Sequence, residues 1–288
     1  MRSTQTSQSR QNMQQIGFGA LTLMTALTVT PIVIVVIYIL IQGLPAISWE
    51  FLTSFPEQGM RAGGIVPAIV GTVLLTLGTA IFAVPLGIGA AIYLAEYAPD
   101  NRWTRIIRLA IINLAGIPSV VYGLFGLGMF VIFLQFGTSI LAGSLTLAIM
   151  TLPVIISTAE EALRAVPQSF RVISISLGAT RWQTIRRIVL PEALPGILTG
   201  VILGLERAAG ETAPILFTVA VFFLPRLPYS PLDATMALPY HLFVISTSVP
   251  GMPIQIQYGT ALVLIVFVLS MNILASIIRS RARARRQW

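Results

Sequence analysis

Long stretches without a charged residue dominate the pattern of this chain. Residues 11–49, 62–95, 109–159 and 234–278 contain no Asp, Glu, Lys or Arg. A helix needs roughly 20 apolar residues to cross about 30 Å of hydrocarbon, so the first two stretches hold one span each. The third stretch is too long for one crossing, and a turn at residues 135–139 divides it into two spans.

Each predicted span is a long and mostly apolar run, and together the runs predict six transmembrane helices. They cover about residues 16–41, 66–95, 109–135, 139–159, 197–224 and 258–278. The predicted fold class is therefore all-α, and the protein is predicted to be a polytopic membrane protein.

The loops and tails between these helices define the parts of the chain. The second outer loop, residues 225–257, is rich in proline and contains the apolar stretch 238–244, which is too short to cross a bilayer. This stretch predicts a short re-entrant or interfacial helix. The predicted parts are a tail at 1–15, a first helix with its outer loop at 16–64, a five-helix core at 65–278 that includes a cytoplasmic loop at 160–196, and a basic tail at 279–288.

Arginine residues predict the orientation of these helices. All 18 basic residues are arginine, and 15 of them lie in segments that six spans place on one side of the membrane. Only Arg61 and Arg226 fall on the other side, while Arg207 lies within a span. Positive residues concentrate on the cytoplasmic side of membrane proteins, so both termini are predicted to be cytoplasmic. The net charge of +8 is explained in this way, and we expect no nucleic-acid partner.

Composition excludes several classes of function. Hydrophobic residues make up 56% of the chain and charged residues 10%, whereas a soluble domain is about one quarter charged. The chain has no lysine and no cysteine, and His241 is its single histidine. A phosphate loop with its lysine and a thiolate site are therefore excluded, and no motif of an intramembrane hydrolase is present. We expect no catalytic residue, no metal and no cofactor in this chain, so ATP-derived energy would come from a partner.

Three charged residues interrupt the fifth predicted span. A charge near the bilayer centre costs about 2.5 to 3.5 kcal/mol on insertion scales, so Glu206, Arg207 and Glu211 should not face lipid. Arg207 and Glu211 are four residues apart and can pair on one helix face. The planar guanidinium also suits tetrahedral oxyanions. We assign Arg207, Glu211, Thr212 and Glu206 to the lining of a polar substrate pathway; the alternative is an ion pair that only locks helices together.

A long, mostly polar loop joins the fourth and fifth predicted spans. Within residues 160–196 the spacing G-x9-I-x-L-P runs from Gly178 to Pro191. This pattern predicts a short helix that ends at Leu177, a turn at Gly178 and a second helix that carries Trp182 and stops at Pro191. Such a helix pair would present apolar side chains to a partner at the membrane surface.

The same spacing resembles the cytoplasmic docking loop of ABC importer permeases. The resemblance is closer still to the PstA family of phosphate importer permeases, and it extends over nearly the whole chain. It is carried by AVPLGIGAAIYLAEY at residues 83–97, GIPSVVYGLFG at 116–126 and RAAGETAP at 207–214. The resemblance implies the six-helix architecture of a type I (MetI-like) permease.

One position departs from the family pattern. The family's loop begins Glu-Ala-Ala six residues before its glycine, but residues 172–174 of this chain are Val, Ile and Ser. Docking is therefore expected to depend on basic and apolar side chains of the loop instead. The candidate docking residues are Arg171, Leu177, Gly178, Ala179, Arg181, Trp182, Leu190 and Pro191.

The resemblance also implies a function and a set of partners. It implies a multi-pass transport subunit of the bacterial inner membrane that moves inorganic phosphate into the cytoplasm and has no ATPase site of its own. The implied partners are a PstC-like sister permease, a PstB-like ATPase dimer that holds ATP and magnesium, and an external PstS-like phosphate-binding protein. The alternative is a stand-alone oxyanion channel or secondary transporter, which the long docking-like loop disfavours.

Overall fold

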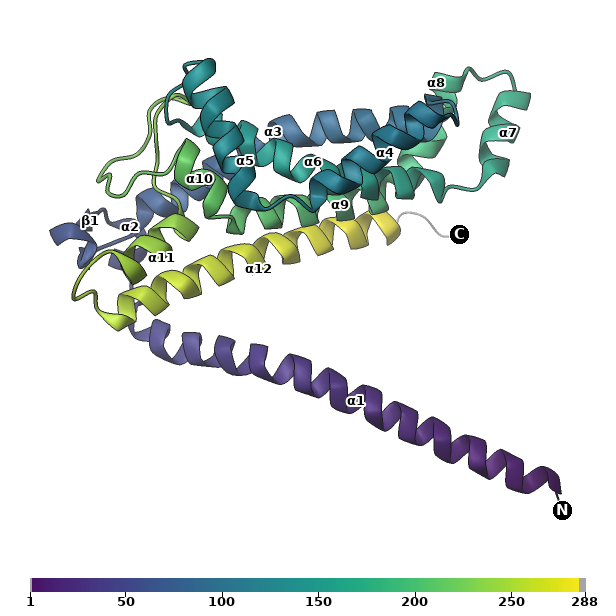
Figure 1. Cartoon of the computed structure of the whole chain (residues 1–288), viewed down its shortest axis with the longest axis horizontal. Helices are drawn as coiled ribbons and strands as arrows, with labels where there is room; N and C mark the ends of the chain where they lie inside the picture. The colour runs from purple at the N-terminus through teal and green to yellow at the C-terminus, as the bar shows by residue number, and fades with distance from the viewer. Residues whose placement is uncertain (1, 285–288) are drawn as a thin grey trace.

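The computed structural model describes residues 2–284, and it describes side chains from Met13 to Arg281 except those of Ile16 and Ile278 (Figure 1). The end of the predicted basic tail, residues 285–288, lies outside the described residues. The helices, in chain order, are α1 (Arg2–Gly43), η1 (Leu44–Ala46), α2 (Trp49–Thr53), η2 (Gln58–Met60), α3 (Val66–Ile92), η3 (Tyr93–Tyr97), α4 (Arg102–Ala115), α5 (Ser119–Gly126), η4 (Leu127–Phe133), α6 (Ile140–Arg164), α7 (Gln168–Ser176), α8 (Arg181–Thr184), η5 (Ile185–Val189), α9 (Leu190–Gly210), α10 (Ala213–Thr218), α11 (Leu238–Thr247) and α12 (Ile254–Ala284). Two antiparallel strands of two residues each, β1 (Pro56–Glu57) and β2 (Ala62–Gly63), form a short hairpin.

Membrane-spanning helices form most of the molecule, as the sequence predicts. Within the described residues, five helices are long and apolar enough to cross a bilayer, and a sixth span results if α4 and the helix that follows it count as one. Figure 1 shows α3, α6 and α9 running side by side, with α12 along one side of them. The prediction of an all-α membrane protein is confirmed, but two of the six spans differ from their expected form.

The predicted third span is broken by a sharp bend. The axes of α4 and of the helix at 119–133 differ by 101°. Pro118 precedes α5, and proline disfavours a helical conformation at the residue before it, so the helix breaks at Ile117. The Tyr122 hydroxyl donates to the Leu114 carbonyl oxygen at 2.7 Å and joins the two sides of the break. The expectation of one continuous helix over 109–135 is therefore wrong.

The fifth span begins earlier and ends earlier than expected. One helical run continues from Arg181 through the π-helical segment η5 to Gly210, so the predicted stop at Pro191 is wrong. Pro191 is the second residue of α9 and directly follows the π-helical segment η5, so the regular α-helical hydrogen-bond pattern is already interrupted where the proline lacks its N–H group. The chain then leaves the helix after Gly210 and forms the separate helix α10, so the expected run from 197 to 224 is not continuous.

The core of the bundle lies between α3, α6 and α9, where small residues allow the helices to approach closely. A cluster of buried residues joins the three helices, and it includes Ala83 of α3, Ala159 of α6 and Ile197 of α9. A Cβ atom added at Gly200 of α9 would lie 2.6 Å from the Cβ atom of Thr158 on α6. Close backbone approach of this kind is how membrane helices associate without a hydrophobic driving force between them.

The two ends of the bundle differ in structure. One end carries α2, the β1–β2 hairpin and α11, whereas α7 and α8 form the other (Figure 1). The predicted short helix of the second outer loop is present as the ten-residue α11, and it is packed into the bundle with Leu238, His241, Val244 and Ile245 buried. The helix α1 contacts α12 near the α11 end and then diverges from it, so that both ends of the described chain lie toward the end that carries α7 and α8.

Candidate functional site

The fifth span breaks at its polar residues, and the local sequence explains the break. Glu211 has an extended backbone with φ −76° and ψ 135°, and α10 starts with a proline in its first turn. Pro214 has no N–H group to donate to the carbonyl of Gly210, so the helix cannot continue across this point without losing a hydrogen bond. We call Arg207, Glu211 and Thr212 the polar break.

Arg207 and Glu211 pair with each other across the polar break. The Arg207 Nε atom donates to the Glu211 Oε1 atom at 3.2 Å, as their spacing predicts. The Arg207 side chain is 39% exposed and that of Glu211 is 17% exposed. The Glu211 carboxylate thus lies inside the bundle, while part of the guanidinium faces outward. Thr212 is half-buried directly after this pair.

Glu211 lines a narrow cavity between several helices. The cavity has a volume of about 10 Å³, which is close to the minimum that holds one water molecule. Its wall includes Thr72 and Thr76 of α3, Leu147 of α6 and Pro239 of α11. A tetrahedral oxyanion does not fit in this volume. Arg207 is not part of the cavity wall, and an anion would meet it from the exposed part of its side chain.

Glu206 is directed to another side of α9. Its Oε2 atom accepts a hydrogen bond from the Asn272 amide of α12 at 3.2 Å, and its Oε1 atom is buried with no hydrogen-bond partner among the described residues. The structure therefore brings Arg207, Glu211 and Thr212 together but separates Glu206 from them. Glu206 lies in the contact between α9 and α12.

The end of the bundle opposite α11 carries a helix–turn–helix that we call the docking segment after its predicted role, residues 168–184. Gly178 has a φ of +85°, so the turn predicted there is confirmed. Thr180 begins α8 with a capping box, since its hydroxyl accepts from the Gln183 N–H while the Gln183 side chain accepts from the Thr180 N–H. The hydroxyl groups of Ser174 and Thr184 lie 2.8 Å apart and are buried between the two helices.

Apolar side chains project from the tip of the docking segment. Leu177 is 83% exposed and Trp182 is 53% exposed. Val172 and Ile173, which stand where the family has Glu-Ala, are also exposed and add to this surface. Exposed apolar groups of this kind indicate a contact with another protein or with lipid. Of the remaining predicted docking residues, Ala179 lies in the turn, whereas Leu190 and Pro191 are half-buried at the start of α9.

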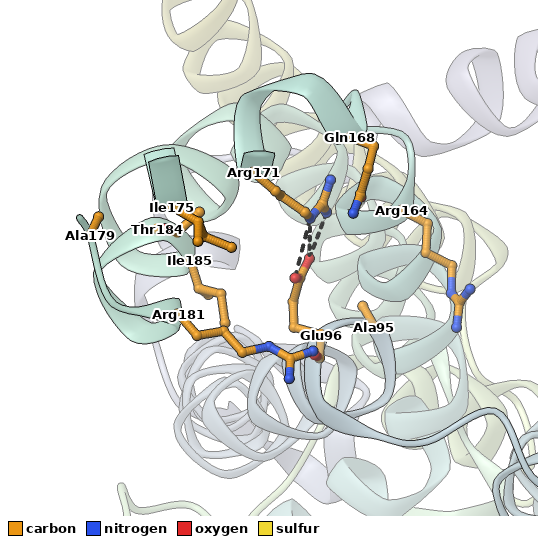
Figure 2. A pocket seen from close by; sticks show the side chains of 10 residues that line it. All are labelled: Ala95, Glu96, Arg164, Gln168, Arg171, Ile175, Ala179, Arg181, Thr184 and Ile185. Carbon is orange, nitrogen blue, oxygen red and sulfur yellow. Dashed lines mark hydrogen bonds and ion pairs between the residues drawn. The ribbon is translucent and has the colours of Figure 1, made fainter. Parts of the chain in front are cut away.

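The two arginines of the predicted docking set turn inward to Glu96 of η3. The Arg171 NH2 atom lies 2.6 Å from the Glu96 Oε1 atom, and the guanidinium also donates to the carbonyl oxygens of Val166 at 2.7 Å and Leu163 at 2.9 Å. Arg181 donates to the Glu96 carbonyl oxygen and lies 5.1 Å from the Tyr97 ring centroid. Figure 2 shows both arginines directed to Glu96 across one edge of a cavity of about 580 Å³.

A second acidic residue holds two further arginines beside Glu96. The Glu160 Oε1 atom of α6 accepts from Arg108 Nε at 2.8 Å and from Arg164 Nε at 2.9 Å. Both arginines also donate to the Leu94 carbonyl oxygen, at 2.9 and 3.4 Å respectively. The carbonyl groups at the end of a helix have no partner within it, and cations stabilise this end of the helix dipole. We call Arg108, Arg164, Arg171 and Arg181 the arginine cluster.

Local sequence patterns predict some of these contacts but not others. Thr180 and Gln183 form the capping-box pattern, which could have marked the start of α8. Glu160 and Arg164 stand four residues apart and could have been paired on one helix face. Glu96 and Arg171 are separated by 75 positions, and no local pattern links them.

His241 is buried at the opposite end of the bundle. Its side chain is 2% exposed, and its Nδ1 atom has no hydrogen-bond partner within the described part of the chain. Burial lowers the pKa of His241 to about 4, so the imidazole is neutral at pH 7. A neutral imidazole at this buried position supplies no positive charge for an anion.

The sequence is similar to a family of transport proteins. The family model described as "Binding-protein-dependent transport system inner membrane component" matches residues 83–285. A protein named "Probable phosphate transport system permease protein PstA" from Methanocaldococcus jannaschii is 35% identical over 253 residues, covering 88% of this chain and 87% of that protein. "Probable ABC transporter permease protein YqgI" from Bacillus subtilis is 35% identical over 252 residues, covering 83% and 85%. "Phosphate transport system permease protein PstA 1" of Mycobacterium tuberculosis is 38% identical, covering 81% and 74%.

The fold is also similar to solved structures. A chain of the inward-facing MetNI methionine ABC transporter matches with a TM-score of 0.61 and 18% identity, covering 76% of this chain and 95% of that one. A chain of a bacterial ABC transporter involved in the import of the acidic polysaccharide alginate matches with a TM-score of 0.62 and 15% identity, covering 82% and 84%. At these identities the likeness concerns the fold.

Proposed function

The chain belongs to the binding-protein-dependent transport system inner membrane component family, and from this premise we propose that it is the phosphate-conducting permease subunit of an ATP-driven importer. Members of this family are the membrane components of such systems and are not themselves catalytic. The alignments with relatives named as phosphate permeases cover more than two thirds of this chain and of each relative, which supports phosphate as the substrate.

The observation that carries this proposal is the Arg207–Glu211 pair at the polar break. A guanidinium within a membrane span is costly unless it faces water or a partner, and such residues mark substrate pathways by default. The fork of N–H donors on arginine matches the oxygen atoms of a tetrahedral oxyanion. Glu211 already accepts from Nε, so an anion would meet the remaining donors. Because the pair partly neutralises the charge, the anion would be held weakly enough to pass on.

The proposed pathway runs along the exposed side of Arg207 and needs a second subunit to complete it. The cavity inside this chain, about 10 Å³, is too small for the substrate. A sister permease that packs against this side would enclose the guanidinium and exclude lipid from it. This arrangement fits the resemblance to two-permease importers, with a PstC-like chain as the proposed sister subunit.

Energy is proposed to enter at the docking segment. Its exposed Leu177 and Trp182 form an apolar tip at the inner end of the molecule, opposite the end with α11. We propose that a PstB-like ATPase dimer binds this tip and that a PstS-like protein delivers phosphate at the other end. Both termini would then be cytoplasmic. ATP and magnesium would reside in the ATPase, because this chain has no lysine for a phosphate loop.

Reconstitution tests the proposal. The chain would be purified with the subunits that accompany it in native membranes, placed in proteoliposomes and supplied with radiolabelled phosphate and the external binding protein. Uptake that requires ATP, and that excess unlabelled phosphate suppresses more than sulfate, is the expected result. Uptake by this chain alone under an ion gradient would indicate a channel or secondary transporter instead, and uptake of another solute would refute phosphate as the substrate.

A further inference from the structure

Among the described residues, the hydrogen bonds between the docking segment and the helical run of α3 and η3 all go to Glu96. Its carboxylate accepts from Arg171 of α7, and its backbone carbonyl accepts from Arg181 at the start of α8. The side chains of Arg171 and Glu96 are 13% and 7% exposed, so this ion pair is shielded from solvent. A shielded pair with several hydrogen bonds holds its geometry much better than a surface pair.

The docking segment itself behaves as one unit. The buried contact of 2.8 Å between Ser174 and Thr184 fastens α7 to α8, and the capping box of Thr180 fixes the turn between them. Beside this unit lies the cavity of about 580 Å³, which separates Ile175 and Ala179 from the bundle (Figure 2). A displacement of the segment can therefore reach the bundle through the end of α6, through the start of α9 and through Glu96, and only Glu96 leads to α3.

The helix α3 connects Glu96 with the polar break. Thr72, Leu75 and Thr76 of α3 line the same narrow cavity as Glu211. At a rise of 1.5 Å per residue, the 20 residues between Thr76 and Glu96 span about 30 Å of helix. The arginine cluster holds the inner end of this helix, and the cavity beside Glu211 lies near its outer end. A movement imposed at Glu96 thus has a direct structural route to the polar break.

We propose that Glu96 is a positioning residue that couples displacement of the docking segment to α3 and thereby to opening of the pathway at Arg207. This inference rests on the proposed function, in which a partner ATPase moves the docking segment. It assigns to Glu96 and Arg171 a role in transmission within this chain, rather than a contact with the ATPase or with substrate.

The number of phosphate ions moved per ATP hydrolysed distinguishes coupling from a merely structural role. Uptake and hydrolysis would be measured on the same proteoliposomes with the complete complex. Glu96→Gln keeps the shape of the side chain and removes its charge, so the complex should still hydrolyse ATP while the ratio of transport to hydrolysis falls by about tenfold, a common size for coupling between two sites. Glu96→Asp keeps the charge on a shorter side chain and should give an intermediate ratio.

Glu161→Gln is the matched control, because Glu161 is an exposed glutamate of α6 next to Glu160 and should leave the ratio unchanged. If Glu96→Gln fails to assemble, Arg171→Lys provides the same test, since a single ammonium cannot reach Glu96 and both carbonyl groups together. A proportional loss of uptake and hydrolysis, or a wild-type ratio, in the variant that assembles would overturn the inference alone. Absence of ATP-dependent uptake in the wild type would overturn the proposed function, and the inference with it.

Discussion

Two glycine-to-alanine substitutions that are chemically identical should have opposite effects on stability. A methyl group at Gly200 would lie 2.6 Å from the Thr158 Cβ atom and 3.0 Å from its Cγ2 atom. Carbon atoms that are not bonded settle at about 3.5 to 4.0 Å, so α6 and α9 must separate by about 1 Å. A methyl group at Gly89 on α3 would meet no heavy atom within 4 Å in the described structure, which makes this position the matched control.

The expected magnitudes follow from these distances. Overpacking a close contact costs about 1 to 3 kcal/mol, and replacing Gly by Ala in a helix returns about 1 kcal/mol. Because the added methyl group would lie only 2.6 Å from a Cβ atom, the upper part of this cost applies. Gly200→Ala should therefore lower the free energy of unfolding by about 1 to 2 kcal/mol, whereas Gly89→Ala should leave it unchanged or raise it by up to ~1 kcal/mol.

Thermal unfolding of the purified protein in detergent measures this difference. For a chain of this size, 1 kcal/mol corresponds to a change in Tm of about 2 to 4 °C. Gly200→Ala should melt several degrees below the wild type, and Gly89→Ala at or above it. Equal shifts for the two variants, or a Gly200→Ala protein as stable as the wild type, would refute the close packing of α6 and α9.

Three further substitutions test other parts of the structure. Trp182→Glu should release the ATPase or abolish phosphate-stimulated hydrolysis in the purified complex, whereas Gln183→Glu adds the same charge, retains the capping box and should have little effect; full stoichiometry and hydrolysis in Trp182→Glu would refute the docking assignment. Gly178→Ala places a methyl group on a residue with φ +85°, which costs about 1 to 2 kcal/mol, and should weaken ATPase binding measured by titration. Unchanged affinity would show that the conformation of this turn does not affect docking. His241 should make the protein less stable as the pH falls from about 6.5 to 4, by as much as ~3 kcal/mol, because the unfolded chain binds a proton in this window and the folded chain does not. Melting curves of the His241→Leu variant should lack this part of the pH dependence; an unchanged slope would show that other groups cause it.

The sequence predicts the membrane helices well because hydrocarbon excludes charge. Charge-free runs therefore marked the spans, and residues 135–139 marked the turn before α6. The bend at Pro118 was missed because both of its sides are apolar, so hydropathy does not change across it. Pro191 was interpreted as a stop because proline ends helices, but here it follows the π-helical segment η5 and the helical run continues through it.

The candidate site was predictable where its contacts are local. The pairing of Arg207 with Glu211 follows from a spacing of four residues, and the turn at Gly178 follows from the preference of glycine for positive φ. The direction of Glu206 toward α12 depends on how α9 is rotated against its neighbours, which the sequence alone does not define. Tertiary packing likewise turns Arg171 toward Glu96.

In the proposed mechanism, the Arg207 guanidinium faces the phosphate pathway. The most direct test measures ATP-driven uptake of radiolabelled phosphate by complexes that carry Arg207→Ala, Arg207→Lys or, as a control, Arg105→Ala, which removes an exposed arginine of α4. All three complexes should assemble. Arg207→Ala should abolish uptake, and Arg207→Lys should impair it, because a point charge does not reproduce the planar fork; Arg105→Ala should retain uptake. Normal uptake by an assembled Arg207→Ala complex would show that Arg207 does not face the pathway.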